Sequence, residues 1–183
     1  MTIEQFKECV LSEAHSAYGI SIYKVKCESD FKDWFKSRAD YYASSNSQIE
    51  TALDSERQKE PGLCYANARS SLTFGNLKYV EGFYHVTGHK YMIAPHAFNL
   101  DETTKRVHDY TAFGQEYASR IEFYGGIVFE QTEIDNLLEI AKRLGCNYSE
   151  RSQLSLVVPV FYYQKNKQDA IREWHFRMPG MFE

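Results

Sequence analysis

Several features that mark large classes of protein are missing from this sequence. The chain has 183 residues, and its 21 basic and 25 acidic side chains are spread along it without a block of one sign. A nucleic-acid partner or an anionic membrane surface is therefore not expected, because both depend on clustered positive charge. No apolar run is long enough to span a bilayer. Residues 1–11 also have neither the basic start nor the apolar stretch of a signal peptide.

Cysteine is sparse, and its spacing excludes some common uses. Its four positions are Cys9, Cys27, Cys64 and Cys146, and no two of them form a CxxC pair. A zinc ribbon or a thioredoxin-type motif is therefore not expected. Free thiols in a reducing cytoplasm are the simplest setting, although an even count would also permit two disulfides in a secreted protein.

The material for a sizeable core is present. Hydrophobic residues make up 43% of the chain and aromatic residues 15%, which is ample for one ordinary domain. We expect a single α+β domain over 1–183, with a helical part over about 1–60, a cysteine-bearing helix and antiparallel sheet over about 61–130, and a helix and strand over 131–183. The sequence carries no indication of the oligomeric state.

Hydrophobic periodicity predicts the individual elements. Apolar residues recur at helical spacing over 3–19, where Thr2 can cap the helix, and over 30–42, 48–58, 64–74 and 133–144. Short β-like runs separated by turn residues occupy 77–86, 91–100, 106–111, 121–129 and 155–164. Pro159 would place the last of these strands at an edge or a bulge.

Cys64 stands at the start of one predicted helix, shortly after the turn signal Pro61-Gly62. Unpaired backbone N–H groups and the helix dipole favour a thiolate at such a position, and the thiolate is the nucleophilic form of cysteine. Cys64 is therefore a candidate nucleophile. The alternative is a small buried hydrophobic residue, which is how free cysteine often behaves.

The polar turn DETT joins two predicted strands and brings a histidine toward an aspartate. If Leu100 faces Lys105, the antiparallel register sets His96 directly opposite Asp109, with both side chains on one face. His108 then falls on the other face. This register predicts that Asp109, rather than His108, is the partner of His96.

Together with Cys64, this pair would have the chemistry of a catalytic triad. Cys64 would attack a carbonyl carbon, His96 would take and later return a proton, and Asp109 would fix the imidazole tautomer. Two alternatives stay open here. One is a cross-strand ion pair on the surface, and the other is a metal site with all three side chains as ligands.

Four short runs carry a resemblance to a known superfamily. They are PGLCYANA from position 61, YVEGFYHV from 79, HAFNLD from 96 and RVHDYTA from 106. Together they resemble the core of transglutaminase-like and papain-like cysteine enzymes, including small bacterial and phage-encoded members. In those families a helix begins with the nucleophilic cysteine, and strands bearing the histidine and then the aspartate follow. Cys64, His96 and Asp109 stand in that order, and the resemblance covers roughly residues 61–112.

The chain departs from the family pattern at two places. Phe98 stands where tryptophan is usual, and Tyr110 replaces a proline after the aspartate. The resemblance also implies an oxyanion-binding residue. Gln58, six residues before Cys64, is similar in position to the glutamine that fills this role, although a solvated glutamine on a helix surface is the alternative.

Tyr65, Tyr124 and Gly125 are candidate substrate-binding residues. The run Tyr124-Gly125-Gly126 is similar to a loop that follows the aspartate strand in the phage-type members. Its glycines would let backbone approach a substrate, and a strand bulge is the alternative.

His85 and His89 have a spacing that can occur in metal sites. They straddle a predicted turn at Thr87-Gly88, and no carboxylate or cysteine motif nearby completes a site. We expect two histidines beside a turn and no metal.

The triad and the resemblance imply thiol-dependent acyl transfer on an amide of a protein or peptide, through a thioester on Cys64. Peptide hydrolysis, glutamine deamidation and transglutamination share this chemistry; hydrolysis is the preferred expectation, and no cofactor is needed. The alternative is a catalytically inactive binding module with a papain-like fold, which would inhibit or sequester a host protein through its cleft or aromatic surface. A Cys64 sulfur close to one ring nitrogen of His96, with Asp109 on the other, would favour the enzyme.

Overall fold

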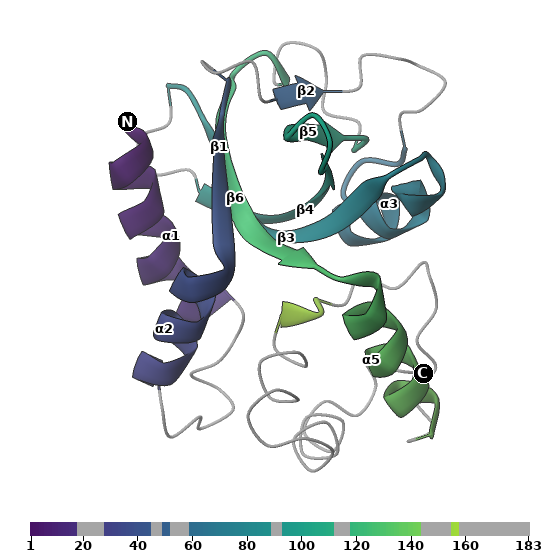
Figure 1. The fold of residues 1–183 in the computed structure, drawn as a ribbon. Coiled ribbons are helices and arrows are strands. Elements are labelled where there is room, and N and C mark those ends of the chain that lie inside the picture. The colour runs from purple at the N-terminus through teal and green to yellow at the C-terminus, as the bar shows by residue number, and fades with distance from the viewer. Residues whose placement is uncertain are drawn as a thin grey trace.

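Six strands form one curled sheet, and the helices lie outside it (Figure 1). The computed structural model describes residues 1–17, 28–44, 49–51, 59–88, 93–111, 118–143 and 155–157. The helices within these ranges are α1 (Ile3–Ala17), α2 (Glu28–Arg38), α3 (Cys64–Ser70), the short 3₁₀ helix η2 (Ser71–Thr73) and α5 (Gln131–Arg143). The chain is thus an α+β protein, as the sequence predicts.

The sheet has the strand order β1-β6-β3-β4-β5-β2. Its strands are β1 (Ala39–Ala43), β2 (Ile49–Thr51), β3 (Leu77–Val86), β4 (Ile93–Asp101), β5 (Arg106–Asp109) and β6 (Ile121–Phe129). Neighbouring strands are antiparallel except β2, which runs parallel to β5. The predicted bounds of β3 and β6 are confirmed.

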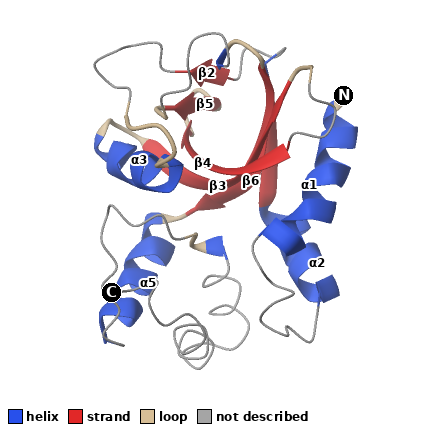
Figure 2. Cartoon of the chain, turned by 180° about the vertical axis from the view of Figure 1, so that it is seen from behind, coloured by secondary structure: helices blue, strands red, loops and turns tan. Residues whose placement is uncertain are grey.

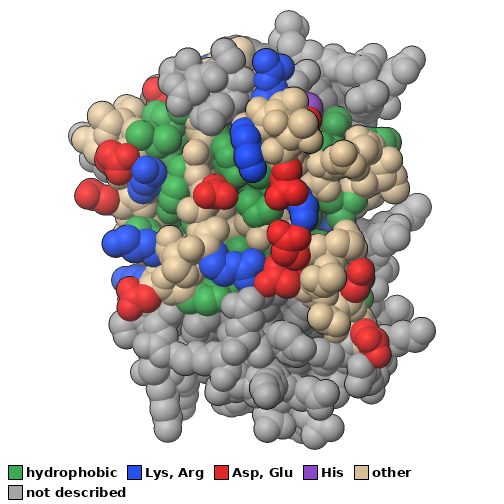
Figure 3. Space-filling view, in the orientation of Figure 1, with side chains coloured by type: hydrophobic (Ala, Val, Ile, Leu, Met, Phe, Trp, Pro, Cys, Tyr) green, Lys and Arg blue, Asp and Glu red, His purple; other side chains and the backbone are tan. Residues whose placement is uncertain are grey.

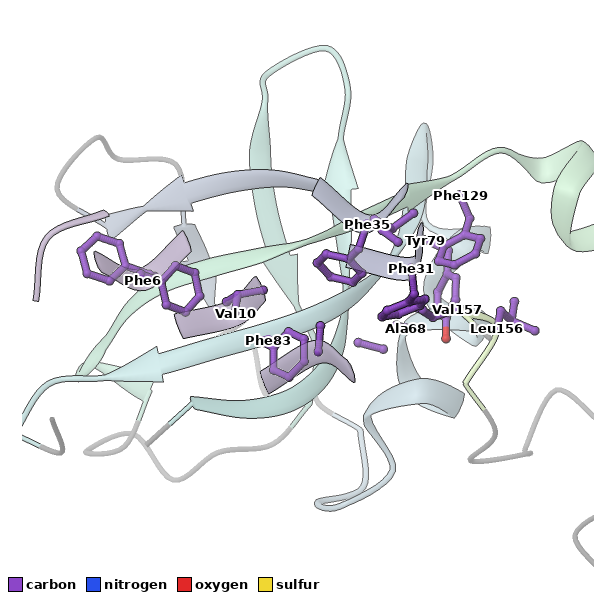
Figure 4. Close-up of a cluster of buried hydrophobic side chains, with 14 of the residues drawn as sticks. Phe6, Val10, Phe31, Phe35, Ala68, Tyr79, Phe83, Phe129, Leu156 and Val157 are labelled. Carbon is purple, nitrogen blue, oxygen red and sulfur yellow. The ribbon is translucent and has the colours of Figure 1, made fainter. Parts of the chain in front are cut away.

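Alternating strand residues build one core on each face of the sheet, because successive side chains point to opposite faces. On the outer face, the helices pack their aromatic residues against β3 and β6 (Figure 4); this core includes Phe6, Val10, Phe31, Phe35, Ala68, Tyr79 and Phe83. The buried members of the inner core all come from strands, among them Tyr42, Val80, Tyr84, Phe98, Val107 and Tyr124. The buried core on the inner face of the curl is therefore formed by strand side chains packing against one another, without helix residues.

Two facing glycines let β3 and β6 approach closely. Gly82 lies opposite Gly126, and a Cβ built on Gly82 would overlap the backbone of Gly125 and Gly126. Only glycine fits such a backbone approach. From β3 onward the sheet curls, so that β4 and β5 come round toward β6 (Figures 1 and 2).

The predicted helix over 30–42 is wrong in its last part. α2 ends at Arg38, and residues 39–43 form β1, which pairs with β6. Tyr41 packs against Phe6 on the outer face, whereas Tyr42 lies opposite Tyr124 on the inner face. Adjacent aromatic residues that pack on opposite faces require a strand, and aromatic residues favour strands.

Two further predicted segments fall partly outside the described residues. The helix over 48–58 is wrong at its start, where residues 49–51 form β2, and residues 52–58 lie outside the described ranges. The strand over 155–164 is not formed at 155–157, where the Ser155 hydroxyl and the Leu156 N–H donate hydrogen bonds to the buried Glu81 carboxylate. The remainder of that segment, with Pro159, lies outside the described ranges.

The hairpin between β4 and β5 has a register two residues away from the predicted one. Leu100 pairs with Val107 rather than with Lys105, and Asp101 pairs with Arg106. The loop begins one residue later than expected because Asp101 extends the strand and its carboxylate accepts the backbone N–H groups at 103 and 104. Since the side-chain period of a strand is two, this displacement keeps every side chain on its predicted face.

Charged side chains of both signs share the surface of the described part (Figure 3). Arg38 forms a two-point ion pair with Glu133, which ties α2 to α5. Lys78 lies between Glu102 and Glu130, at 3.6 and 2.5 Å. Within the described ranges, no helix combines the length and the apolar character that crossing a membrane would need.

Candidate active site

Cys64 is the first residue of α3, and a set of polar contacts fixes this end of the helix at the end of β5. Lys59 forms a parallel bridge with Thr111, directly after β5. The Asn67 side-chain amide donates to the carbonyl oxygen of Glu60 at 2.7 Å and to the Thr111 hydroxyl at 3.4 Å. The Cys64 thiol is free and half-buried. The start of the helix is therefore held beside the strands that carry the other two candidate residues.

His96 and Asp109 form a buried ion pair on the inner face. The His96 Nε2 donates to Asp109 Oδ2 over 2.7 Å, and the two residues are only 3% and 2% exposed. The structure thus brings this pair together, although not directly across the hairpin as predicted. With Leu100 opposite Val107, Asp109 falls diagonal to His96. Diagonal neighbours on one face remain within reach of long side chains.

Asp109 is held by two further donors. Its Oδ1 accepts the backbone N–H of Thr111 at 3.0 Å, and its Oδ2 accepts the hydroxyl of Tyr124 at 2.7 Å. Both carboxylate oxygens are therefore satisfied inside the protein, which a buried charge requires. Asp109 is fixed from its own strand, from β4 and from β6.

The surroundings of His96 favour its charged form. Burial alone would lower the pKa of His96, but the charge and hydrogen bond of Asp109, together with a side-chain hydrogen bond and charge interaction with Cys64, raise it to about 10. Because Nε2 is bound to Asp109, Nδ1 is the ring nitrogen left for Cys64. The arrangement can therefore hold a thiolate and an imidazolium side by side, with the carboxylate behind the ring.

Aromatic side chains enclose the imidazole. Tyr84 meets the His96 ring edge-to-face at a centroid distance of 5.0 Å, Tyr124 lies at 6.1 Å and Phe98 stacks at 6.5 Å. These rings exclude water from the ion pair and restrict rotation of the imidazole. Phe98, at the position where the family pattern has tryptophan, is part of this enclosure.

The other predicted site residues are placed differently. Gln58, the predicted oxyanion residue, lies outside the described ranges. Tyr65 is half-buried and packs against the outer core. A Cβ on Gly125 would meet the rings of Tyr41 and Phe6 on the outer face, so this position points away from the face that carries His96. It pairs regularly with β1 and β3, which also excludes the alternative of a bulge at this glycine.

Tyr124 was expected to contact substrate, but it is fully buried and binds Asp109. Asn67 and Thr111, which position α3 and Asp109, did not emerge from the sequence as site residues. Both stand inside the runs that carry the family resemblance, three residues after Cys64 and two after Asp109. Their proximity to the candidate residues was the only available signal, and polar residues close to such positions are common.

His85 lies in β3 beside the turn at Thr87-Gly88, as predicted. It is buried at the end of β3 on the outer face, with Nδ1 3.3 Å from Glu122 Oε2 and its ring beside Phe6 and Phe123. Its predicted counterpart, His89, lies outside the described ranges. In the part of the chain that the structure describes, no group of three potential ligands is arranged to hold a metal ion.

Comparison with protein-family models, with curated proteins and with solved structures finds no match for this chain. The interpretation of the site therefore depends on its own geometry. That geometry is a free thiol at a helix start, an imidazole that interacts with it, and a carboxylate fixed on the far side of the imidazole.

Proposed function

We propose that this protein is a cysteine-dependent enzyme that transfers an acyl group from an amide of a protein or peptide, with Cys64, His96 and Asp109 as its catalytic triad. The observation that carries the proposal is the position of His96, which interacts with Cys64 while its Nε2 binds Asp109 at 2.7 Å. A surface ion pair would not need this burial or the additional donors on Asp109. The arrangement is the one expected of a nucleophile, its general base and the group that orients the base.

In the first half of the reaction, the thiolate of Cys64 attacks the carbonyl carbon of the amide and forms a C–S bond. The His96 imidazolium gives its proton to the amide nitrogen, the C–N bond breaks, and the amine leaves with that proton. The raised pKa of His96 suits this step because the ring still carries the proton at neutral pH. The product is a thioester on Cys64.

In the second half, the neutral His96 removes a proton from water, and the resulting oxygen nucleophile attacks the thioester carbon. The C–S bond breaks, and Cys64 returns as the thiolate beside the imidazolium. A lysine amine in place of water would give a crosslink. We propose hydrolysis as the main outcome because it needs no second macromolecular substrate.

The arrangement of elements also supports a papain-like or transglutaminase-like core. The cysteine begins a helix that packs on an antiparallel sheet, and the histidine and aspartate strands follow it as neighbours. The chain keeps the family order on elements of the expected type. A thiol-dependent reaction requires reduced Cys64, so we also propose a reducing compartment such as the cytoplasm.

The first test measures alkylation of Cys64 by iodoacetamide as a function of pH, with mass spectrometry locating the adduct. The wild type is compared with His96→Ala and with His108→Ala, which removes a histidine from the other face of the same hairpin. Cys9 is an internal reference because it is also a free, half-buried thiol. We expect fast alkylation of Cys64 at neutral pH that is lost in His96→Ala and kept in His108→Ala.

A different result would reverse the proposal. If Cys64 reacts no faster than Cys9 at neutral pH, and if His96→Ala leaves its rate unchanged, the triad is not a reactive unit. The alternative of a catalytically inactive binding module would then be preferred. If the expected result is found, peptides and glutamine-containing proteins are the substrate classes to screen.

A further inference from the structure

The Tyr124 hydroxyl binds Asp109 although the two residues stand on strands that are not adjacent in the sheet. Tyr124 lies on β6 and Asp109 on β5, and β3 and β4 stand between these strands in the sheet order. The Tyr124 hydroxyl nevertheless lies 2.7 Å from Asp109 Oδ2. In a flat sheet, three strand spacings would separate the two backbones by about 14 Å. The contact therefore exists only because the sheet curls.

The hydroxyl binds the same carboxylate oxygen that accepts His96 Nε2. Asp109 Oδ1 is occupied by the backbone N–H of Thr111. The carboxylate is thus held at both oxygens, and rotating it to release Tyr124 would also displace it from His96. The orientation of the imidazole depends on this carboxylate, since Asp109 is its partner at Nε2.

We propose that Tyr124 is a positioning residue of the candidate active site, which fixes Asp109 and, through it, the imidazole of His96. This inference rests on the proposed function for its catalytic meaning. The Tyr124 hydroxyl donates to Asp109 Oδ2, so its effect on the imidazole passes through Asp109. It also replaces the substrate-binding role that the sequence alone suggested for this tyrosine.

The alternative is that Tyr124 contributes only packing. It is fully buried and its ring lies 4.9 Å from Phe98, so removing the whole side chain would damage the inner core whatever the hydroxyl does. Only a change that deletes the hydroxyl and keeps the ring separates the two roles. Tyr124→Phe is that change.

A matched control is available in the same row of the sheet. Tyr42 lies directly opposite Tyr124, is also buried, and packs its ring against Phe98. Its hydroxyl lies in the field of Asp40 and Glu102. Tyr42→Phe therefore removes a buried hydroxyl from the same face without removing a donor to Asp109.

The experiment follows the titration of His96 by NMR in ¹⁵N-histidine-labelled protein. The chain has six histidines, and the His96 signals are assigned by their absence in His96→Gln. The titratable groups around this ring include Cys64 from α3, Asp109 from β5, Tyr84 from β3 and Tyr124 from β6. A carboxylate with one donor fewer attracts the imidazolium more strongly, so Tyr124→Phe should raise the pKa of His96 by about one pH unit. Tyr42→Phe should leave the titration unchanged.

A double-mutant comparison tests whether the effect passes through Asp109. In an Asp109→Asn background, Tyr124→Phe should no longer change the His96 titration. An unchanged titration in the Tyr124→Phe single variant overturns the proposal, as does an equal shift in Tyr42→Phe or a shift that persists with Asn at position 109.

The titration does not require turnover, so its result is separate from that of the proposed function. If the reactivity of Cys64 does not depend on His96, the proposed enzymatic function is refuted. The effect of Tyr124→Phe on the His96 titration still tests the positioning role of Tyr124 separately. If Tyr124→Phe does not fold, the wild-type hydroxyl proton gives the same test. Slow exchange with water and an Overhauser contact to the His96 ring support the proposal, and fast exchange without that contact overturns it.

Discussion

Replacing Gly82 by alanine should damage the candidate site through the shape of the sheet. Gly82 is not part of the proposed triad, but it lies opposite Gly126 in the pairing of β3 with β6. A Cβ at this position would overlap the Gly125 carbonyl oxygen and the Gly126 Cα. Both obstacles are backbone atoms, which cannot move aside as a flexible side chain can. β3 and β6 must therefore separate.

The expected cost is about 3 kcal/mol of unfolding free energy, at the upper end of the range for adding a methyl group to a packed site. Separation of β3 from β6 also opens the curl that brings Tyr124 to Asp109. The NMR titration of His96 should therefore change along with stability. Urea unfolding measures the first effect, and the labelled histidine spectrum measures the second.

Gly75→Ala is the control for a general loss of stability. Gly75 has φ +104°, and nothing lies within 4 Å of a Cβ built there, so alanine would cost backbone strain alone. This variant should lose about 1–2 kcal/mol and keep the His96 titration of the wild type. A Gly82→Ala protein with wild-type stability and an unchanged His96 signal would refute the argument that these glycines set the curl.

Three further predictions concern charge and buried polar contacts. Because the pKa of His96 is raised from 6.5 to about 10, the stability that its charged ring contributes is complete below pH 6.5 and is lost as the pH rises through about 10. The difference in unfolding free energy between wild type and His96→Gln should therefore shrink over that interval. Glu81→Ala should cost about 3 kcal/mol in urea unfolding because it leaves the Ser155 hydroxyl and the neighbouring backbone N–H without their buried acceptor, and Glu81→Gln should cost less. Arg38→Ala should lower the unfolding free energy by about 1 kcal/mol through loss of its two-point contact with Glu133. Added salt should lower the unfolding free energy of the wild type more than that of this variant, because salt screens the ion pair.

Local patterns predicted the elements whose own residues decide their structure. β3 and β6 have their predicted bounds because each is long and rich in β-branched and aromatic residues. α1 begins at Ile3 as expected, since Thr2 and Gln5 exchange hydrogen bonds as a reciprocal cap. Where tertiary pairing decided the outcome, the prediction was wrong. Residues 39–43 continue a helical pattern in sequence, but β6 offers them a free edge and they pair with it.

The prediction of the His96–Asp109 contact succeeded although its register was wrong. The face of a strand residue depends only on whether its position is odd or even, and a displacement of two residues preserves it. The distance along the strand is more sensitive, and the pair is diagonal rather than directly opposite. The sequence therefore predicts which side of the sheet a residue occupies better than it predicts which residue lies directly opposite on the next strand.

The contact of Tyr124 with Asp109 could not be predicted from the sequence, because it depends on the curl of the sheet. The hairpin of β4 and β5 alone could bring His96 to Asp109, because the two strands are neighbours in sequence and in the sheet. Tyr124 joins them only after β6 has paired with β3 and the curl has closed the distance that β3 and β4 would otherwise impose. The close backbone approach at Gly82 and Gly126 is part of that pairing, yet a glycine in a strand sequence is equally compatible with a bulge or a loop. The contact of Tyr124 with Asp109 therefore depends on the shape of the whole sheet, and disturbing the curl should alter the titration of His96 without a substitution in the proposed triad.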